Sequence, residues 1–236
     1  MIILLALAGG WPWGCGGDGV ASEEIRWTAQ RETMVRTQIA ARGVRDDRVL
    51  AAMRSVPRHL FVPLEARSEA YADHPLPIGE GQTISQPYIV GLMSELLAVG
   101  PGSRVLEVGT GSGYQAAVLA TLGCRVFTIE IRESLAAEAR QRLAQLGIQG
   151  VDVRAGDGYA GWPDAAPFDG IIVTAAPEKV PKPLLDQLAI GGRLVIPVGA
   201  FYQQLKVITR EADGFTERDV IPVRFVPMTG EIEKQP

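Results

Sequence analysis

Three glycines, each two residues from the next, directly follow a short apolar run. Residues 105–108 have the composition of a buried strand, and the glycines after it are Gly109, Gly111 and Gly113. Glycines at this spacing let the backbone adopt positive φ and approach a ligand closely. A second apolar run ends at Glu130, about 20 residues further on, where an acidic side chain accepts hydrogen bonds from ribose hydroxyls. The combination predicts a site for a nucleotide-type cofactor.

A second acidic residue follows the next predicted strand. Residues 151–155 are followed by Gly156-Asp157-Gly158, which on its own indicates a plain turn. In a parallel sheet, ligands bind outside the carboxyl ends of the strands. Because the glycine turn, Glu130 and Asp157 each follow a strand, we expect them to belong to one site.

The elements that must position these residues alternate along the chain. We predict strands at 104–108, 125–130, 151–155, 168–174 and 192–198, with helices at 113–122, 133–146 and 181–189. Such alternation predicts an α/β, doubly wound, mostly parallel sheet with right-handed crossovers. Residues 204–210 and 220–226 are expected to form a terminal antiparallel pair. Upstream, residues 22–55 have helical periodicity, 75–87 form a loop, and 89–97 form a helix.

Two groups of motifs carry a resemblance to known proteins. Glu-Val-Gly-Thr-Gly-Ser-Gly-Tyr at 107–114, followed by Ile129-Glu130, resembles the first two motifs of Rossmann-like methyltransferases that use S-adenosylmethionine. Pro-Leu-Pro-Ile-Gly-Glu-Gly-Gln-Thr-Ile-Ser-Gln-Pro-Tyr-Ile-Val at 75–90 closely resembles the signature of protein-L-isoaspartate (D-aspartate) O-methyltransferases. Further similar segments cover 56–63, 173–176, 191–199 and 225–230.

That resemblance implies a protein repair reaction. A methyl group passes from S-adenosyl-L-methionine to the free α-carboxylate of an L-isoaspartyl residue, or to the side-chain carboxylate of a D-aspartyl residue. The ester then collapses to a succinimide, whose hydrolysis regenerates some normal aspartyl residue. The expected partners are peptides and proteins that contain isoaspartyl residues. A sulfonium methyl is electrophilic and the carboxylate is already ionised, so the reaction needs alignment and desolvation but no general base.

The resemblance also assigns roles to individual residues. Ser85 is the implied active-site residue, whose hydroxyl would orient the substrate carboxylate; the competing interpretation makes it the N-cap of the helix after Pro87. Asp157 would contact the adenine amino group. Tyr88 replaces a histidine that some relatives have. The implied cofactor-binding set is Gln82, Thr83, Ile84, Ser85, Tyr88, Gly109, Gly111, Gly113, Glu130, Ile131, Asp157, Gly158 and Thr229.

Three alternatives compete with this interpretation. An enzyme of the same fold could methylate a small-molecule carboxylate or hydroxyl. A cofactor-binding module without catalytic activity is disfavoured, because every motif is intact. A dehydrogenase is disfavoured because the glycine spacing is not Gly-x-Gly-x-x-Gly.

Composition restricts the classes of partner that we expect. The 236 residues carry a formal net charge of −4, and the isoelectric point near 5.3 argues against a nucleic-acid partner. No stretch approaches the roughly 20 apolar residues that span a bilayer. The two cysteines, Cys15 and Cys124, support neither a disulfide framework nor a metal site. We expect a monomer.

The domain boundaries are predicted from the same patterns. Residues 1–20 are expected to be a leader or extension, 21–100 an N-terminal helical elaboration with the active-site loop, and 101–236 the cofactor-binding core with its C-terminal strands. We expect a cytoplasmic protein, because S-adenosylmethionine is made there. The alternatives are export or lipid anchoring through residues 1–20, whose apolar run precedes Gly14-Cys15, and a misassigned start.

Overall fold

A seven-stranded sheet forms the centre of the computed structural model, which describes residues 17–234. The strand order is β5-β4-β3-β6-β7-β8-β9, with parallel pairing from β5 to β7 and antiparallel pairing beyond. The bounds are β3 Arg104–Val108, β4 Arg125–Glu130, β5 Val151–Ala155, β6 Phe168–Val173, β7 Leu188–Val198, β8 Gln203–Arg210 and β9 Phe215–Val223. The predicted doubly wound, mostly parallel sheet with a terminal antiparallel pair is confirmed.

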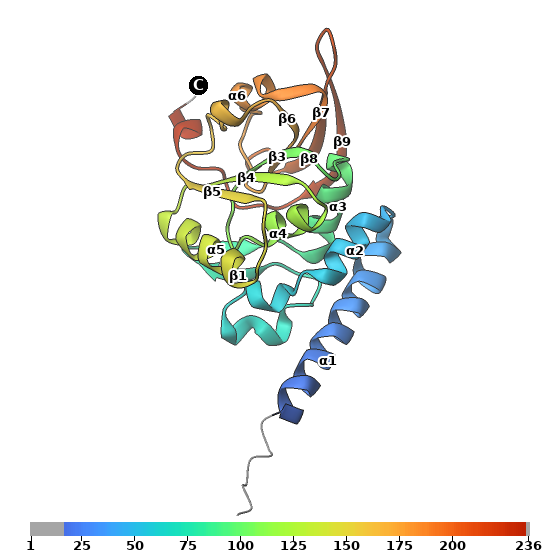
Figure 1. Ribbon diagram of the computed structural model, residues 1–236. Helices are drawn as coiled ribbons and strands as arrows, with labels where there is room; N and C mark the ends of the chain where they lie inside the picture. The colour runs from blue at the N-terminus through green and yellow to red at the C-terminus, as the bar shows by residue number, and fades with distance from the viewer. Residues whose placement is uncertain (1–16, 235–236) are drawn as a thin grey trace, which may run out of the picture.

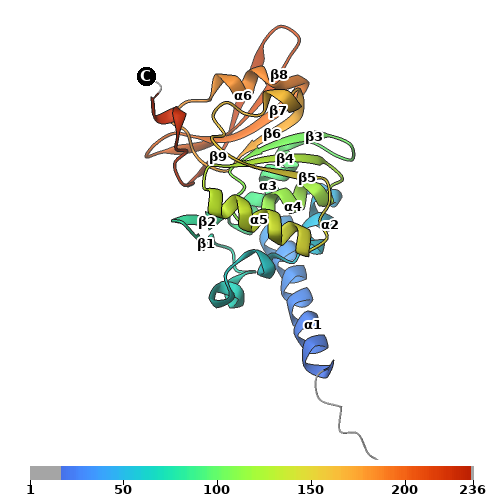
Figure 2. The same ribbon diagram turned by 60° about the vertical axis from the view of Figure 1, so that its left-hand side comes forward.

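Helices cover both faces of this sheet. Figures 1 and 2 show α3, α4 and α5 on one face and α6 on the other, with α1 extending away from the rest of the fold. Their bounds are α1 Gly17–Met34, α2 Asp47–Ser55, α3 Pro87–Leu97, α4 Tyr114–Thr121, α5 Glu133–Gln145 and α6 Lys182–Asp186. Short helical turns lie at Val35–Ile39, Ala40–Arg42, Arg58–Phe61, Leu64–Glu69, Pro163–Ala165 and Glu231–Lys234.

Strand β3 lies at the middle of the sheet and is buried on both faces. Val105 packs into the hydrophobic core beneath α3, α4 and α5, and Leu106 packs into the core on the α6 side. Successive side chains of a strand point to opposite faces, so a strand covered on both sides is apolar almost throughout. The acidic Glu107 within β3 is fully buried and is therefore exceptional.

Four segments differ from the predicted elements, one of them the helix predicted at 181–189, which ends at Asp186. The predicted loop at 75–87 contains a hairpin of β1 (Leu76–Gly79) and β2 (Gln82–Ile84). Strand β7 begins earlier than predicted, because Leu188 already pairs with Phe168. The pairing register then shifts at the glycine pair that follows. Strand β9 begins at Phe215, although the next four residues are polar. Lys206 on β8 contacts Glu217 and Asp219 across the strand pair.

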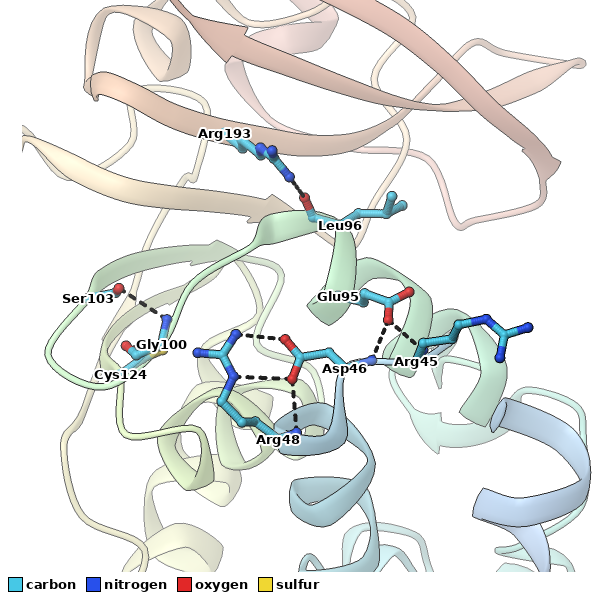
Figure 3. A network of polar contacts seen from close by, with 9 residues as sticks. All are labelled: Arg45, Asp46, Arg48, Glu95, Leu96, Gly100, Ser103, Cys124 and Arg193. Carbon is cyan, nitrogen blue, oxygen red and sulfur yellow. Dashed lines mark hydrogen bonds and ion pairs between the residues drawn. The ribbon is translucent and has the colours of Figure 1, made fainter. Parts of the chain in front are cut away.

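Helix α3 connects the N-terminal elements to the sheet. One carboxylate oxygen of Glu95 accepts hydrogen bonds from the backbone N–H groups of Arg45 and Asp46, at 2.5 and 2.6 Å. At the end of α3, the guanidinium of Arg193 on β7 donates to the carbonyl of Leu96 at 3.2 Å (Figure 3). Because α3 begins directly after the segment 82–86, these contacts also fix that segment relative to the sheet.

The predicted domain boundaries stay predictions. The larger hydrophobic core takes buried residues from both sides of residue 100. Residues 1–16, including Cys15, lie outside the described residues, and α1 begins at Gly17. Cys124 is buried, as expected of a small core residue. Within 17–234 no helix has the length and apolar character required to span a membrane.

Candidate active site

A cavity lies at the carboxyl ends of β3, β4 and β6, where the strand order of the sheet reverses. Such a switch point is the usual ligand site of an open α/β sheet. The hairpin segment 82–85 and the C-terminal segment 226–229 form further walls. Ten predicted site residues line it: Gln82, Thr83, Ile84, Ser85, Gly109, Gly111, Glu130, Ile131, Gly158 and Thr229.

Contacts around the first glycine of the turn leave no room for a side chain. The N–H of Gly109 donates to the carbonyl of Ile129 at 2.8 Å, and its carbonyl accepts from the Thr174 hydroxyl at 2.6 Å. A Cβ atom on Gly109 would lie 2.3 Å from that hydroxyl oxygen, and φ there is +98°. Gly113 has a different role: it precedes α4, outside the cavity lining, where a Cβ would face Leu143 of α5.

Glu130, at the end of β4, holds this turn in place. One oxygen accepts from the N–H of Gly111 at 2.8 Å and the other from the N–H of Arg132 at 3.0 Å. The side chain is only 5% exposed. An ionised carboxylate has about four lone-pair sites, so each oxygen keeps acceptor capacity after one hydrogen bond. The group can therefore hold the turn and also accept from the two hydroxyls of a ribose.

Asp157 and Tyr88, with Gly113, are predicted site residues that do not line the cavity. The carboxylate of Asp157 accepts from the backbone N–H of Tyr159 at 2.8 Å and from that of Glu231 at 2.6 Å. It therefore closes the turn after β5 and fastens the C-terminal segment. The ring of Tyr88 is buried and lies 3.5 Å from the guanidinium carbon of Arg42. Their contacts with a cofactor stay predictions.

Ser85 lies between β2 and α3 and is half-buried at the edge of the cavity. The N-cap residue of α3 is Gln86, with Pro87 in the first turn, and no side chain caps this helix. The interpretation of Ser85 as the helix N-cap is therefore wrong. Within residues 17–234 no group forms a hydrogen bond with the Ser85 hydroxyl, which leaves it available to a ligand.

Glu107 is a cavity-lining residue that the sequence interpretation missed. One oxygen accepts from the Thr128 hydroxyl at 2.5 Å, while the other, Oε1, is buried without a partner among the described residues. Burial raises the pKa of this carboxyl to about 8. An unpaired buried acceptor that borders a cavity suits a cationic donor such as an ammonium group. The detectable signal in the sequence is an acidic residue inside an otherwise apolar strand.

Comparison with known proteins identifies the family. A family model described as Protein-L-isoaspartate(D-aspartate) O-methyltransferase (PCMT) matches residues 29–233. This chain belongs to that family. It is 56% identical over 200 residues to the protein-L-isoaspartate O-methyltransferase of Gloeobacter violaceus, spanning 84% of this chain and 98% of that protein. It is 59% identical over 202 residues to the Methylorubrum populi protein of the same name, spanning 85% and 95%.

Solved structures agree with the family assignment. A protein-L-isoaspartate O-methyltransferase structure superposes with a TM-score of 0.78 at 29% identity, covering 86% of this chain and 67% of the other. A structure from Plasmodium falciparum, described as a putative member in complex with S-adenosyl-L-homocysteine, gives 0.74 at 26% identity, covering 84% and 98%. The predicted methyltransferase fold and family are thus confirmed.

The buried carboxyl of Glu107 predicts a pH-dependent effect on stability. Its pKa rises from 4.5 to about 8 on folding, so between these values the folded state binds more protons than the unfolded state. The free energy of unfolding must then fall as the pH rises through that range. We expect Glu107→Gln to remove this loss. The free energy of unfolding of the variant, relative to that of the wild type, should therefore increase from pH 5 to pH 9.

Chemical denaturation of both proteins at the two pH values measures the effect. Glu65→Gln, which replaces an exposed carboxylate, is the control and should follow the wild type. If the stability difference between Glu107→Gln and the wild type were the same at pH 5 and pH 9, the raised pKa of Glu107 would be contradicted.

Proposed function

We propose that this protein transfers a methyl group from S-adenosyl-L-methionine to the free carboxylate of L-isoaspartyl residues in damaged proteins. The observation that carries the proposal is the position of Ser85. Its unbonded hydroxyl borders the same cavity as Glu130 and the glycine turn, in a chain of the isoaspartate methyltransferase family. Methylation of D-aspartyl residues is part of the same proposal.

The residues that line the cavity match the chemistry of the cofactor. Glu130 would accept from the ribose hydroxyls, and the unpaired oxygen of Glu107 would accept from the cationic amino group. Gly109 and Gly111 keep the backbone close to the ligand. S-adenosylmethionine, when bound, supplies an electrophilic methyl group. These residues therefore bind and orient; none of them has to remove a proton.

Ser85 lines the cavity and would face the substrate carboxylate. The Ser85 hydroxyl would donate a hydrogen bond to one oxygen of the isoaspartyl carboxylate and so aim the other oxygen along the transfer direction. Orientation and removal of water by the cavity walls can supply several kcal/mol of catalysis. No observation in this structure favours a small-molecule methyl acceptor.

We further propose that the protein acts as a cytoplasmic monomer. The place of synthesis of S-adenosylmethionine, the cytoplasm, supports this location.

Paired peptides test the proposed substrate. We expect labelled methyl incorporation into a peptide with an isoaspartyl linkage and essentially none into its aspartyl counterpart, because only the former places a free α-carboxylate on a main chain extended by one carbon. The label should be lost in mild base, as a carboxyl ester would be. Equal labelling of both peptides, or a base-stable label, would contradict an isoaspartyl substrate.

A second prediction concerns Ser85. Ser85→Ala should lower kcat by roughly 10- to 100-fold, since one hydrogen bond to a charged acceptor contributes about 1.5–3 kcal/mol and an interaction that strengthens in the transition state appears in kcat. Affinity for S-adenosylhomocysteine and the thermal midpoint should stay near wild type, because the hydroxyl caps no helix.

The exposed Ser68→Ala serves as the matched control and should change neither property. Turnover, product affinity and thermal midpoint are measured on each variant. A lower midpoint with unchanged turnover per folded molecule would assign Ser85 a structural role only.

A further inference from the structure

Two adjacent aromatic side chains project into solvent at the turn between β7 and β8. Phe201 is 99% exposed and Tyr202 is 96% exposed. An aromatic side chain carries 150–250 Å² of surface that is usually buried in a core or an interface. Two such side chains in succession form an apolar patch of the kind that marks binding sites.

The turn that presents these aromatic residues is firmly held. The N–H of Gly199 donates to the carbonyl of Pro177 at 2.9 Å. A Cβ atom on Gly199 would lie only 2.1 Å from the carbonyl oxygen of Tyr202, and φ there is +128°. The backbone therefore folds back on itself at this point, and the aromatic side chains extend outward from it.

A groove lies between this turn and the cofactor cavity. Phe201 lines one part of it, and Pro227 and Met228 line both the groove and the cavity. The groove therefore adjoins the cavity where the methyl group would be transferred, with these two residues between the two hollows. Its remaining lining comes from the loop after β6, the end of β9 and the C-terminal helical turn, with Ala176, Glu178, Lys179, Val223, Arg224 and Ile232 among its residues.

We infer that this groove binds the polypeptide that flanks the isoaspartyl residue. Phe201 in the groove lining, together with the exposed Tyr202 beside it, holds a large apolar or aromatic side chain of that polypeptide. The inference rests on the proposed function. A methyl acceptor within a protein has residues on both sides, which must leave the cavity along a path. An extended chain advances about 3.3 Å per residue, so the second to fourth flanking residues reach outside the cavity.

The chemistry of the groove favours an apolar occupant over a charged one. Its ionisable residues have both signs, with Glu178 and Glu233 opposed by Lys179 and Arg224. Such a mixture gives little net attraction to either charge. The side chains of Met228, Ile232 and Phe201 instead provide apolar contact, and aromatic rings stack on one another in preferred geometries.

Steady-state kinetics with matched peptides test the inference. One peptide carries isoaspartate flanked only by alanine and glycine. The others carry a single phenylalanine at the second, third or fourth position on either side. We expect the wild-type protein to show a several-fold lower KM for at least one phenylalanine peptide, with kcat nearly unchanged.

Phe201→Ala/Tyr202→Ala should abolish this preference and leave kcat and the KM for the alanine peptide at wild-type values. Ile190→Ala, which removes an exposed apolar side chain outside the groove, should keep the preference. A wild-type protein without preference, or a double variant that retains it, would overturn the inference while the proposed function stands. Absence of methylation of every isoaspartyl peptide would overturn the proposed function.

Sedimentation velocity tests whether the aromatic patch binds a second copy of the chain instead of the substrate polypeptide. We expect the wild type and the double variant to sediment alike across concentrations. A dimer that Phe201→Ala/Tyr202→Ala dissociates, with no change in peptide kinetics, would assign the aromatic patch to self-association and overturn the inference.

Discussion

The buried carboxylate of Glu130 is the constraint on which the cofactor end of this protein depends. Its two oxygens accept from the N–H groups of Gly111 and Arg132, so one side chain joins the turn after β3 to the turn after β4. Each turn leads into a helix, α4 or α5, that covers the same face of the sheet. The relative position of these two turns, and with it the width of the cavity, is set by a charged group whose hydrogen bonds are shielded from water.

The substrate side of the site is fixed to this frame at two places. Helix α3 is held to the sheet by Arg193 and to the N-terminal segment by Glu95. At the other end, Glu80 in the turn between β1 and β2 accepts from the Ser134 hydroxyl at 3.1 Å and lies 3.7 Å from the Arg132 guanidinium. The segment 82–85 lies between these anchors, so Ser85 is positioned relative to the cofactor turn from both directions.

Much of this architecture could be predicted from the sequence, for reasons that can be named. Buried parallel strands have mainly apolar runs, and this gave correct bounds for β3 and β4. The bounds of the edge strand β5 were also correct, although its apolar residues alternate with Asp152 and Arg154. The β1–β2 hairpin was missed because its strands are short and its turn is rich in glycine, which resembles a loop. The start of β9 was missed because the four residues after Phe215 are exposed and polar, and the ion pairs from Lys206 are not visible in a local pattern.

Some site residues could be predicted from the sequence and others could not. Gly109 and Glu130 line one cavity because the carboxyl ends of parallel strands meet at one edge. Ser85 reaches the same cavity from the separate β1–β2 hairpin, where the family motif and not the sheet topology predicted its position. Glu107 was missed because its importance depends on burial and on an unpaired oxygen, which only the packed structure shows. The side chain of Asp157 bonds to the backbone of Glu231, and no local pattern could predict that contact across 74 residues.

Calorimetric titration of S-adenosyl-L-homocysteine tests the central claim, that Glu130 organises the cofactor site. Removal of a buried acceptor costs about 1–3 kcal/mol, so Glu130→Ala should weaken binding at least several-fold. Glu133→Ala, which removes an exposed carboxylate in the first turn of α5, should bind as the wild type does. Wild-type affinity in a folded Glu130→Ala protein would contradict the account.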